Sequence, residues 1–162
     1  MEKNWSNTSL VAYSALPKIV KTLDLRLARL VNSGFKSEHL KNGVSTIRLI
    51  GEIMDVNEEK RKIVNLHFIV TTALDKLTDE QRHLLVGKFM ALKTYAQLAE
   101  ERGLSIRTTY RRVESALAKF ASNLAMSGYT EDWFEKEYAD VKYVASVKTR
   151  LSNEKYFSSQ TK

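Results

Sequence analysis

Apolar residues recur every three or four positions along most of the chain, which is the spacing of residues on one face of an α-helix. No segment alternates apolar and polar residues over the length of a strand. Helix formers dominate, and only one proline and six glycines interrupt them. The pattern therefore predicts an all-α protein, built as a helical bundle.

The first predicted helix runs from about Ser9 to Val31, and Pro17 is expected to kink it or to mark a restart one turn in. Its apolar residues follow alternating steps of three and four: Tyr13, Leu16, Val20, Leu23, Leu27 and Leu30. This is the spacing of a coiled-coil seam, so the helix either faces its own core or forms the seam of a dimer. The segment "VNSGFKSEHLKNG" then predicts a loop.

Two further apolar stripes follow the loop. From Val44 to Asp55 one helix face carries Ile47, Ile50 or Gly51, and Met54. The next stretch, "NEEKRK", either turns the chain or is the solvated part of a longer helix, before a second stripe runs from Leu66 to Leu77. We assign residues 1–73 to an N-terminal helical region that serves packing or oligomerisation.

Residues 78–121 carry the signals of a helix-turn-helix. Thr78 and Gln81 have the spacing of a capping box, and the helix they start is expected to bury Leu84, Leu85 and Phe89. In the next short helix, the small residue Ala99 allows close crossing of a second helix. Gly103 follows where a sharp turn favours positive φ, Leu104 can fill the corner, and Ser105 can cap the second helix.

The second helix has two distinct faces at 100° per residue. Thr109, Val113, Ala116 and Phe120 fall on a packed face, flanked by Ile106 and Leu117; Arg107, Thr108, Arg111 and Ser115 fall on the opposite face, with Arg112 and Lys119 at its edge. An arginine fork can hold guanine edges or phosphates, and the first turn of a recognition helix is the part that reaches base edges. The pattern thus predicts a helix aimed at a DNA duplex, although an exposed face of arginines can also be merely solvated.

The C-terminal part looks simpler. The stretch "SNLAMSGYTED" predicts a break after residue 121, and Thr130 followed by two acids predicts a helix start. One C-terminal helix is expected to pack through Phe134, Tyr138, Val141 and Ala145. Its aromatic concentration, which includes Trp133 and Tyr143, either packs on the domain or binds a protein. The polar end "SNEKYFSSQTK" is expected to fray, so residues 125–162 are predicted to be a helix with a flexible tail.

The charge of the chain supports the same prediction as the arginine face. A formal net charge of +7 favours polyanionic partners. The chain has no cysteine, which excludes disulfides, thiol nucleophiles and zinc fingers. No signal peptide and no membrane-spanning stretch is recognisable, so we expect a cytoplasmic protein with no membrane partner.

Enzymatic chemistry finds no support in the sequence. The three histidines, His39, His67 and His83, lie in separate segments without the spacing of a metal site. The segment "VGKFMALKT" lacks the glycines and the hydroxyl residue of a phosphate loop. We expect no enzyme, no cofactor and no metal.

Residues 74–124 resemble the region 4 helix-turn-helix of sigma-70 family factors and their phage relatives. The likeness rests on "LTDEQRHLL", on "TYAQLAEERGLS" and on the "S-x-x-T…A-L" pattern of the recognition helix. Residues 1–73 show no basic-aromatic block of the kind that sigma factors use on melted promoters; "IRLIGEIMDVNEEKRKIVNLHFIVTTALDKL" is instead similar to the leading helices of ArpU-type and RinA-type phage late-transcription regulators.

The resemblance implies a small DNA-binding transcription regulator, encoded by a phage or an integrated element, that acts on a promoter and contacts RNA polymerase. The family's base-contacting positions correspond to Ile106, Arg107, Tyr110 and Arg111. Together with the helical pattern, this gives a predicted DNA-binding set of Ser105, Ile106, Arg107, Thr108, Tyr110, Arg111, Arg112, Ser115 and Lys119.

In that set, Arg107 and Arg111 are expected to read the major groove, and Ser105 is expected to fix the start of the helix. The expected phosphate contacts are Thr108, Arg112, Ser115 and Lys119. Two rival functions remain open: a DNA-packaging component of the small terminase type, and a polymerase-binding protein whose helix-turn-helix contacts protein alone. The operator, activation or repression, and the choice between monomer and homodimer are also left open.

Overall fold

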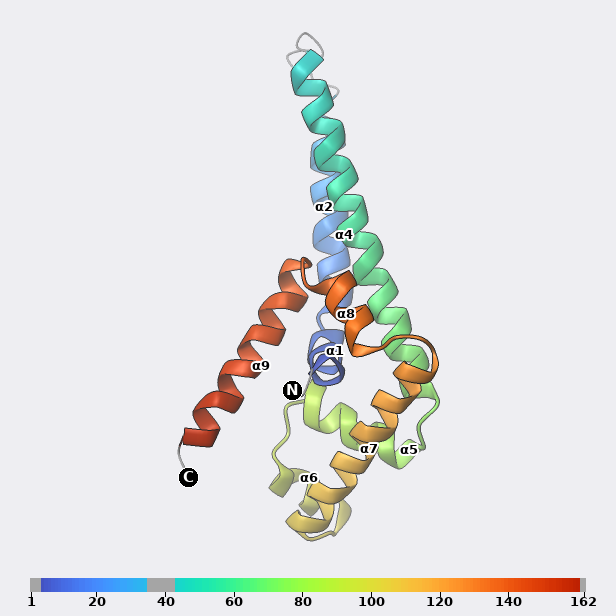
Figure 1. The fold of residues 1–162 in the computed structure, drawn as a ribbon, viewed down its shortest axis with the longest axis vertical. Helices are drawn as coiled ribbons and strands as arrows, with labels where there is room; N and C mark the ends of the chain where they lie inside the picture. The colour runs from blue at the N-terminus through green and yellow to red at the C-terminus, as the bar shows by residue number, and fades with distance from the viewer. Residues whose placement is uncertain (1–3, 35–42, 161–162) are drawn as a thin grey trace. The chain divides into compact units, whose positions relative to one another are not determined.

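The computed structural model describes residues 4–34 and 43–160, and all regular structure in these ranges is helical (Figure 1). The elements are α1 Trp5–Tyr13, α2 Leu16–Gly34, α4 Gly43–Asp75, α5 Asp79–Leu85, the π-helical segment η1 Val86–Met90, α6 Tyr95–Arg102, α7 Ile106–Met126, α8 Glu131–Tyr138 and α9 Lys142–Gln160. The predicted all-α class is confirmed for these residues. Among them, no helix combines the length and the apolar character that crossing a membrane requires.

Contacts divide the chain into two units. The first contains residues 1–14 and 68–162, and the second contains residues 15–67. The sequence pattern had instead suggested boundaries near residues 73 and 124. The grouping differs because α1, at the start of the chain, packs against η1, α7, α8 and α9.

The second unit is a helical hairpin. Helix α2 and the larger part of α4 run side by side in opposite directions (Figure 1), and Lys60 of α4 pairs with Asp24 of α2 at 2.6 Å. Leu23, Val56 and Ile63 are buried. The predicted loop between the helices falls largely on residues 35–42, which lie outside the described ranges.

The single N-terminal helix predicted from Ser9 to Val31 is two helices in the structure. Helix α1 begins at Trp5 and ends at Tyr13, and α2 begins at Leu16. Pro17 explains the break, because its ring nitrogen cannot donate to the carbonyl four residues earlier and the ring clashes with that carbonyl. Proline is compatible with the first turn of a new helix, where no such donor is needed. Of the two predicted effects of Pro17, a kink or a restart of the helix, the structure has the restart.

Helix α4 is continuous from Gly43 to Asp75. The stretch "NEEKRK" is therefore the solvated part of a longer helix and not a turn. Nothing in it breaks a helix, since it contains no glycine or proline.

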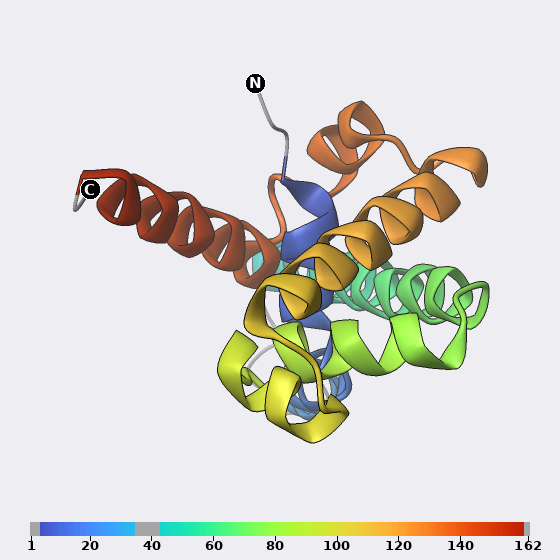
Figure 2. The ribbon, with the colours of Figure 1, turned by 90° about the horizontal axis from the view of Figure 1, so that it is seen from below.

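In the first unit, α1 lies among the other helices (Figure 2) and is almost entirely buried. Two of its buried hydroxyls bond to backbone carbonyls one turn back: Thr8 Oγ1 donates to Asn4 O at 2.8 Å, and Ser9 Oγ donates to Ser6 O at 2.9 Å. Thr8 and Ser9 can be buried here because each hydroxyl finds a backbone acceptor nearby.

Helix α7 extends beyond the break predicted after residue 121. It ends at Met126, and Gly128 then adopts a left-handed conformation with φ 89°. The polar residue Asn123, which suggested a loop, is buried and donates from Nδ2 to Ala73 O at 3.2 Å. Because the buried Asn123 amide has a backbone acceptor, the helix can continue through this polar residue.

Two helices, α8 and α9, replace the single C-terminal helix that was predicted. The chain turns between Tyr138 and Lys142, where Val141 N donates to Tyr138 O at 3.1 Å. Tyr138 and Val141 are buried on either side of the turn. Their spacing continues the apolar pattern of a helix, so the sequence contained no sign of the turn. Helix α9 also continues to Gln160 through the predicted flexible tail, whose residues up to that point include neither glycine nor proline.

Candidate nucleic-acid interface

Helix α5 starts the segment that leads to the predicted recognition helix. Its capping box is formed as predicted: Gln81 N donates to Thr78 Oγ1 at 3.2 Å, and Thr78 N donates to Gln81 Oε1 at 3.1 Å. Leu84 and Leu85 are buried as expected, whereas Phe89, which was also expected to be buried, is only half-buried. The helix then widens into η1, where Ala91 N donates to Val86 O five residues back at 2.9 Å.

A close approach joins η1 to α6. A Cβ atom placed on Gly87 would lie 2.7 Å from Leu98 Cδ2 of α6. Leu98 is fully buried, so its side chain has little room to retreat. Between the two elements Leu92 has φ 55°, a left-handed conformation that is strained for leucine, and its side chain is exposed.

The turn between α6 and α7 has the predicted features. Gly103 is left-handed with φ 62° and ψ 34°, and Leu104 N donates to Ala99 O at 2.9 Å, as in a Schellman motif. Ala99 is buried on the inner side of α6. Ser105 then caps α7, since its Oγ accepts from Thr108 N at 3.1 Å.

The packed face of α7 is the predicted one. Thr109, Val113, Ala116 and Phe120 are each fully buried, and α7 packs on α5 and α6. Thr109 tolerates burial because its Oγ1 donates to Ser105 O at 3.0 Å. This packing sets the rotation of α7 and therefore decides which side chains face outward.

The opposite face of α7 is cationic. Arg107, Arg111 and Lys119 are exposed, as is Ser115. Within the described residues, none of these three cations forms an ion pair or a hydrogen bond to a side chain. The acid Glu114 lies on the same helix, but it does not pair with them. Their charges are therefore available to an anionic partner.

Two other predicted residues are held by the protein itself. Arg112 forms an ion pair with Glu80 of α5 through Nη1 and Oε1. Thr108 is half-buried, and its Oγ1 accepts from Ser105 Oγ at 2.8 Å. Arg112 retains further N–H donors and Thr108 retains its hydroxyl proton, so each can still donate to a second group.

Tyr110 and Ile106 form an apolar edge beside the arginines. Both are exposed, by 49 % and 57 %. The ring of Tyr110 meets the ring of Tyr95 edge-on at 5.2 Å, and Lys88 Nζ lies 4.1 Å from the centre of the Tyr95 ring. Burial raises the pKa of the Tyr95 hydroxyl, and the negative charge of Glu114 adds to the effect. Tyr110 is thus held in place while its ring faces solvent.

Three supporting residues were not among the predicted site residues: Glu80, Lys88 and Tyr95. Glu80 and Tyr95 contact α7 from other elements, and Lys88 contacts the Tyr95 ring. Nothing in the spacing along the chain links these residues to α7. Tyr95 lies in the stretch "TYAQLAEERGLS", whose aromatic position was the available signal.

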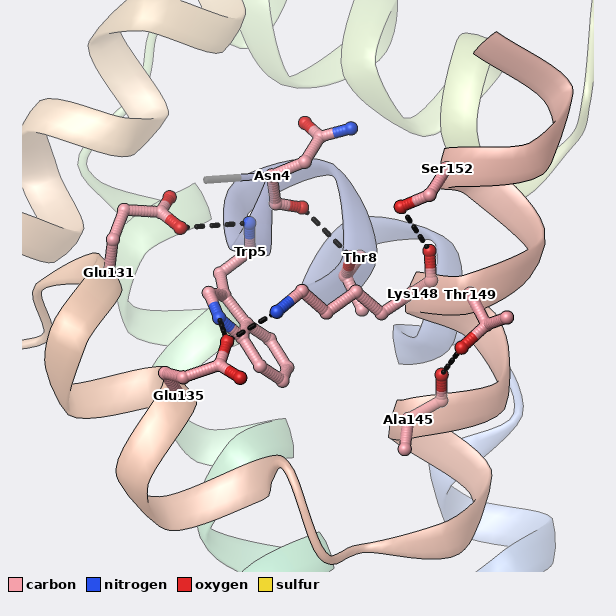
Figure 3. Close-up of polar contacts among 9 residues, drawn as sticks. All are labelled: Asn4, Trp5, Thr8, Glu131, Glu135, Ala145, Lys148, Thr149 and Ser152. Carbon is pink, nitrogen blue, oxygen red and sulfur yellow. Dashed lines mark hydrogen bonds and ion pairs between the residues drawn. The ribbon is translucent and has the colours of Figure 1, made fainter. Parts of the chain in front are cut away.

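A second polar cluster lies in the first unit, among α1, α8 and α9 (Figure 3). Trp5 Nε1 donates to Glu135 Oε2 at 2.9 Å, Trp5 N donates to Glu131 Oε2 at 3.1 Å, and Lys148 also pairs with Glu135. Lys148 Nζ lies 4.3 Å from the centre of the Trp5 ring. An open cavity of about 340 Å³ adjoins these residues.

This cluster fastens α1 to the C-terminal helices. Trp5 is buried and stacks on Phe134 at 5.9 Å between ring centres. Two hydroxyls beside the cavity donate to carbonyls of their own helix, Thr149 Oγ1 to Ala145 O and Ser152 Oγ to Lys148 O (Figure 3). Phe134 and Tyr138 are buried, so these two aromatics pack on the domain, the first of the two interpretations of the C-terminal aromatics.

Comparison of the chain with family models, with curated proteins and with solved structures gives no match in any of the three. What α7 binds is therefore inferred from its own geometry and chemistry.

Proposed function

We propose that the protein binds duplex DNA in a sequence-specific manner through α7. The observation that carries the proposal is a set of cations on the exposed face of α7 that have no counter-ion among the described residues. Arg107 and Arg111 belong to this set, whereas the neighbouring Arg112 is neutralised by Glu80. A solvated surface helix gains stability from pairing such charges with acids one turn away, and α7 does not do so.

The two arginines occupy the first two turns of α7, directly after the capped turn. In a recognition helix these turns reach the major groove, where an arginine fork donates to O6 and N7 of guanine. Four residues separate Arg107 from Arg111, a rise of roughly 6 Å along the helix axis. Ile106 and Tyr110 have the same spacing, so each turn presents one apolar group beside one arginine. An apolar side chain can contact the methyl group of thymine.

In this proposal, most of the other predicted residues contact the sugar-phosphate backbone of the DNA. Lys119 and Ser115 lie further along the exposed face, where a helix leaves the groove and meets phosphates. Arg112 donates to phosphate while Glu80 holds its guanidinium in place, and Thr108 donates its remaining proton. Ser105 fixes the start of α7.

The biological setting of the proposal is transcription control. It rests on the resemblance of residues 74–124 to sigma region 4 and to phage late-transcription regulators. In this setting the protein is a regulator encoded by a phage or a mobile element, and it contacts RNA polymerase at the promoter. The net charge of +7 agrees with a nucleic-acid partner.

The decisive experiment is selection of bound duplexes from a random pool at near-physiological salt. Wild type is compared with the double variant Arg107→Ala/Arg111→Ala and with the control Arg26→Ala/Arg29→Ala. The control removes the same number of arginines from the exposed surface of α2, where Arg26 and Arg29 form no ion pair or side-chain hydrogen bond with the described residues. Net charge is thereby matched.

Wild type and the control are expected to enrich one motif, and the α7 variant is expected to lose it. Each arginine that makes a bidentate base contact contributes roughly 1–3 kcal/mol of discrimination. Equal losses by both double variants would show that only net charge matters and would refute sequence reading by α7.

A second candidate function, a DNA-packaging component, is favoured by one observation. Helix α4 exposes large apolar residues, among them Ile47 and Met54, as an oligomerising element does. Packaging components of the small terminase type join DNA-binding helices to such elements. Light scattering separates the two candidates, because a ring of many copies favours packaging and a monomer or dimer favours the regulator.

A further inference from the structure

Helix α4 carries a second apolar stripe on its exposed side. Its members follow steps of three and four over three heptads: Ile47, Ile50, Met54, Asn57, Arg61, Val64 and Phe68. The apolar members are all exposed, Ile47 by 74 %, Ile50 by 52 %, Met54 by 66 %, Val64 by 48 % and Phe68 by 64 %. We call these seven positions the outer seam. Steps of three and four are the spacing of a coiled-coil seam, in which positions a and d are apolar.

The outer seam is distinct from the buried face of the same helix. Val56, Ile63 and Leu66 are buried, by contrast, and they lie on the other side of α4 at 100° per residue. Helix α4 therefore has two apolar faces, and among the residues that the structure describes one face is covered and the other is exposed. A surface helix that serves only its own core needs one such face.

The two polar members of the outer seam indicate what covers it. When two copies of α4 run in opposite directions, each a residue lies level with a d residue of the other copy. In one register Met54 meets Val64, Ile50 meets Phe68, and Asn57 meets Arg61. Met54 and Ile50 then pair with apolar residues, the polar Asn57 and Arg61 pair with each other, and Ile47 at the end of the seam lies level with Thr71 of the other copy. The two-fold axis of this register crosses the seam midway between Asn57 and Arg61, at the height of residue 59 along the helix.

Electrostatics favour this arrangement over a parallel one. A parallel pair would place Arg61 level with Arg61 of the second copy, and two like charges in one layer repel. In the antiparallel register the Asn57 amide oxygen of one copy can accept from Arg61 of the other. Arg61 also carries its own counter-ion, since Nε and Nη2 donate to the Glu58 carboxylate at 2.9 and 2.6 Å. Arg61 can thus be covered without leaving an unpaired charge.

We propose that the outer seam of α4 binds the outer seam of a second copy of this chain, in an antiparallel two-stranded coiled coil. The contact is isologous, so it closes as a dimer and leaves no seam for a third copy. The central Asn57 and Arg61 set the register, as single polar residues in coiled-coil cores do. The dimer does not depend on DNA binding by α7, and its test requires no DNA.

The first test is the mass of the full chain in solution, by light scattering or sedimentation equilibrium. Wild type is expected at twice 18.6 kDa, and Met54→Glu/Val64→Glu is expected at 18.6 kDa. Each substitution occurs twice across the axis, so each is expected to weaken the dimer by about 100-fold. Both side chains are exposed within the chain, so the variant should retain the helical circular dichroism of wild type.

The matched control is Leu25→Glu. Leu25 is 61 % exposed on α2, outside the seam, and the change replaces an apolar side chain with the same acid. This variant is expected to remain dimeric. If it dissociates as readily as the seam variant, the contact is not made through α4.

Single cysteines decide the direction, because the chain has none of its own. In the proposed register Met54→Cys lies opposite Val64→Cys, while each lies about 15 Å along the axis from its own counterpart. A mixture of the two variants is therefore expected to cross-link under mild oxidation, and either variant alone is not, since a disulfide needs Cα atoms within about 7 Å. Cross-linking of each variant with itself would overturn the antiparallel register, and a monomeric wild type would overturn the proposal as a whole.

Discussion

Replacing Gly103 with alanine tests whether the turn before α7 depends on a left-handed residue. Gly103 has φ 62°, and a Cβ atom there would meet nothing within 4 Å. The added methyl group therefore causes no clash, and only the effect of the substitution on the backbone changes the free energy of unfolding. A left-handed conformation costs an alanine roughly 1–2 kcal/mol, and the stiffer unfolded chain offsets about 0.4–1 kcal/mol of this. The free energy of unfolding should fall by about 1 kcal/mol.

Gly51→Ala is the matched control, because the same methyl group is added in a different conformation. Gly51 lies inside α4, and its Cβ would also meet nothing within 4 Å. Alanine is favoured over glycine by about 1 kcal/mol within a helix, so this variant should be more stable than wild type. The two substitutions thus have opposite predicted signs.

Urea unfolding at one fixed protein concentration measures both effects. Far-UV circular dichroism follows the helices of the whole chain. Fluorescence follows the first unit alone, because the two tryptophans, Trp5 and Trp133, both belong to it. The reasoning would be refuted if Gly103→Ala were neutral or stabilising, like Gly51→Ala.

Three further predictions concern the same region. Leu92→Gly should raise the free energy of unfolding by about 1 kcal/mol, because Leu92 is left-handed with φ 55°; a loss in thermal denaturation would show that the leucine side chain itself stabilises the turn. Ser105→Ala should lower it by about 1 kcal/mol through loss of the cap, whereas Ser105→Asp should retain most of it; equal losses in urea would contradict a capping role. The raised pKa of Tyr95 means that the folded state holds its proton above pH 10, so this contribution to stability is complete below about pH 10 and is lost as the pH rises further. Tyr95→Phe should remove that part of the alkaline decline, and an unchanged decline in unfolding curves from pH 9 to 11 would count against it.

The parts of the fold that the sequence predicted are those decided by neighbouring residues. Thr78 with Gln81, and Ser105 with Thr108, are caps formed within three residues, and the structure has both. The left-handed Gly103 likewise depends on a local turn. These features can be predicted from a short stretch of sequence, because the donor and the acceptor of each hydrogen bond lie within it.

The features that the sequence did not predict depend on residues far apart in the chain. Trp5 donates to Glu131, 126 positions away, and no periodicity of apolar residues reports such a bond. The same holds for the pairing of Arg112 with Glu80, 32 positions away. The sequence placed Arg111 on the exposed face and Arg112 at its edge. It did not show that Arg112 pairs with Glu80, whereas Arg111 has no partner among the described residues.

The apolar faces of α4 show a second limit of prediction from the sequence pattern. Ile47, Ile50 and Met54 were recognised as one helix face, but spacing alone does not say whether a face is covered. In the structure they are exposed, while Val56 and Ile63 of the same helix are buried. Burial in the folded chain, and not spacing, distinguishes the two faces.

The two proposed surfaces differ in the force that would hold their partners, and salt separates them. Binding of DNA by the arginines of α7 releases condensed counter-ions, so its affinity must fall steeply as salt rises. The outer seam of α4 is mostly apolar, and burial of apolar surface is not weakened by such screening. At a salt concentration that abolishes DNA binding, the protein should therefore keep the mass of a dimer. If the dimer instead dissociated over the same range of salt, charge pairing and not apolar contact would hold the copies together, and the assignment of the interface to the outer seam would fail.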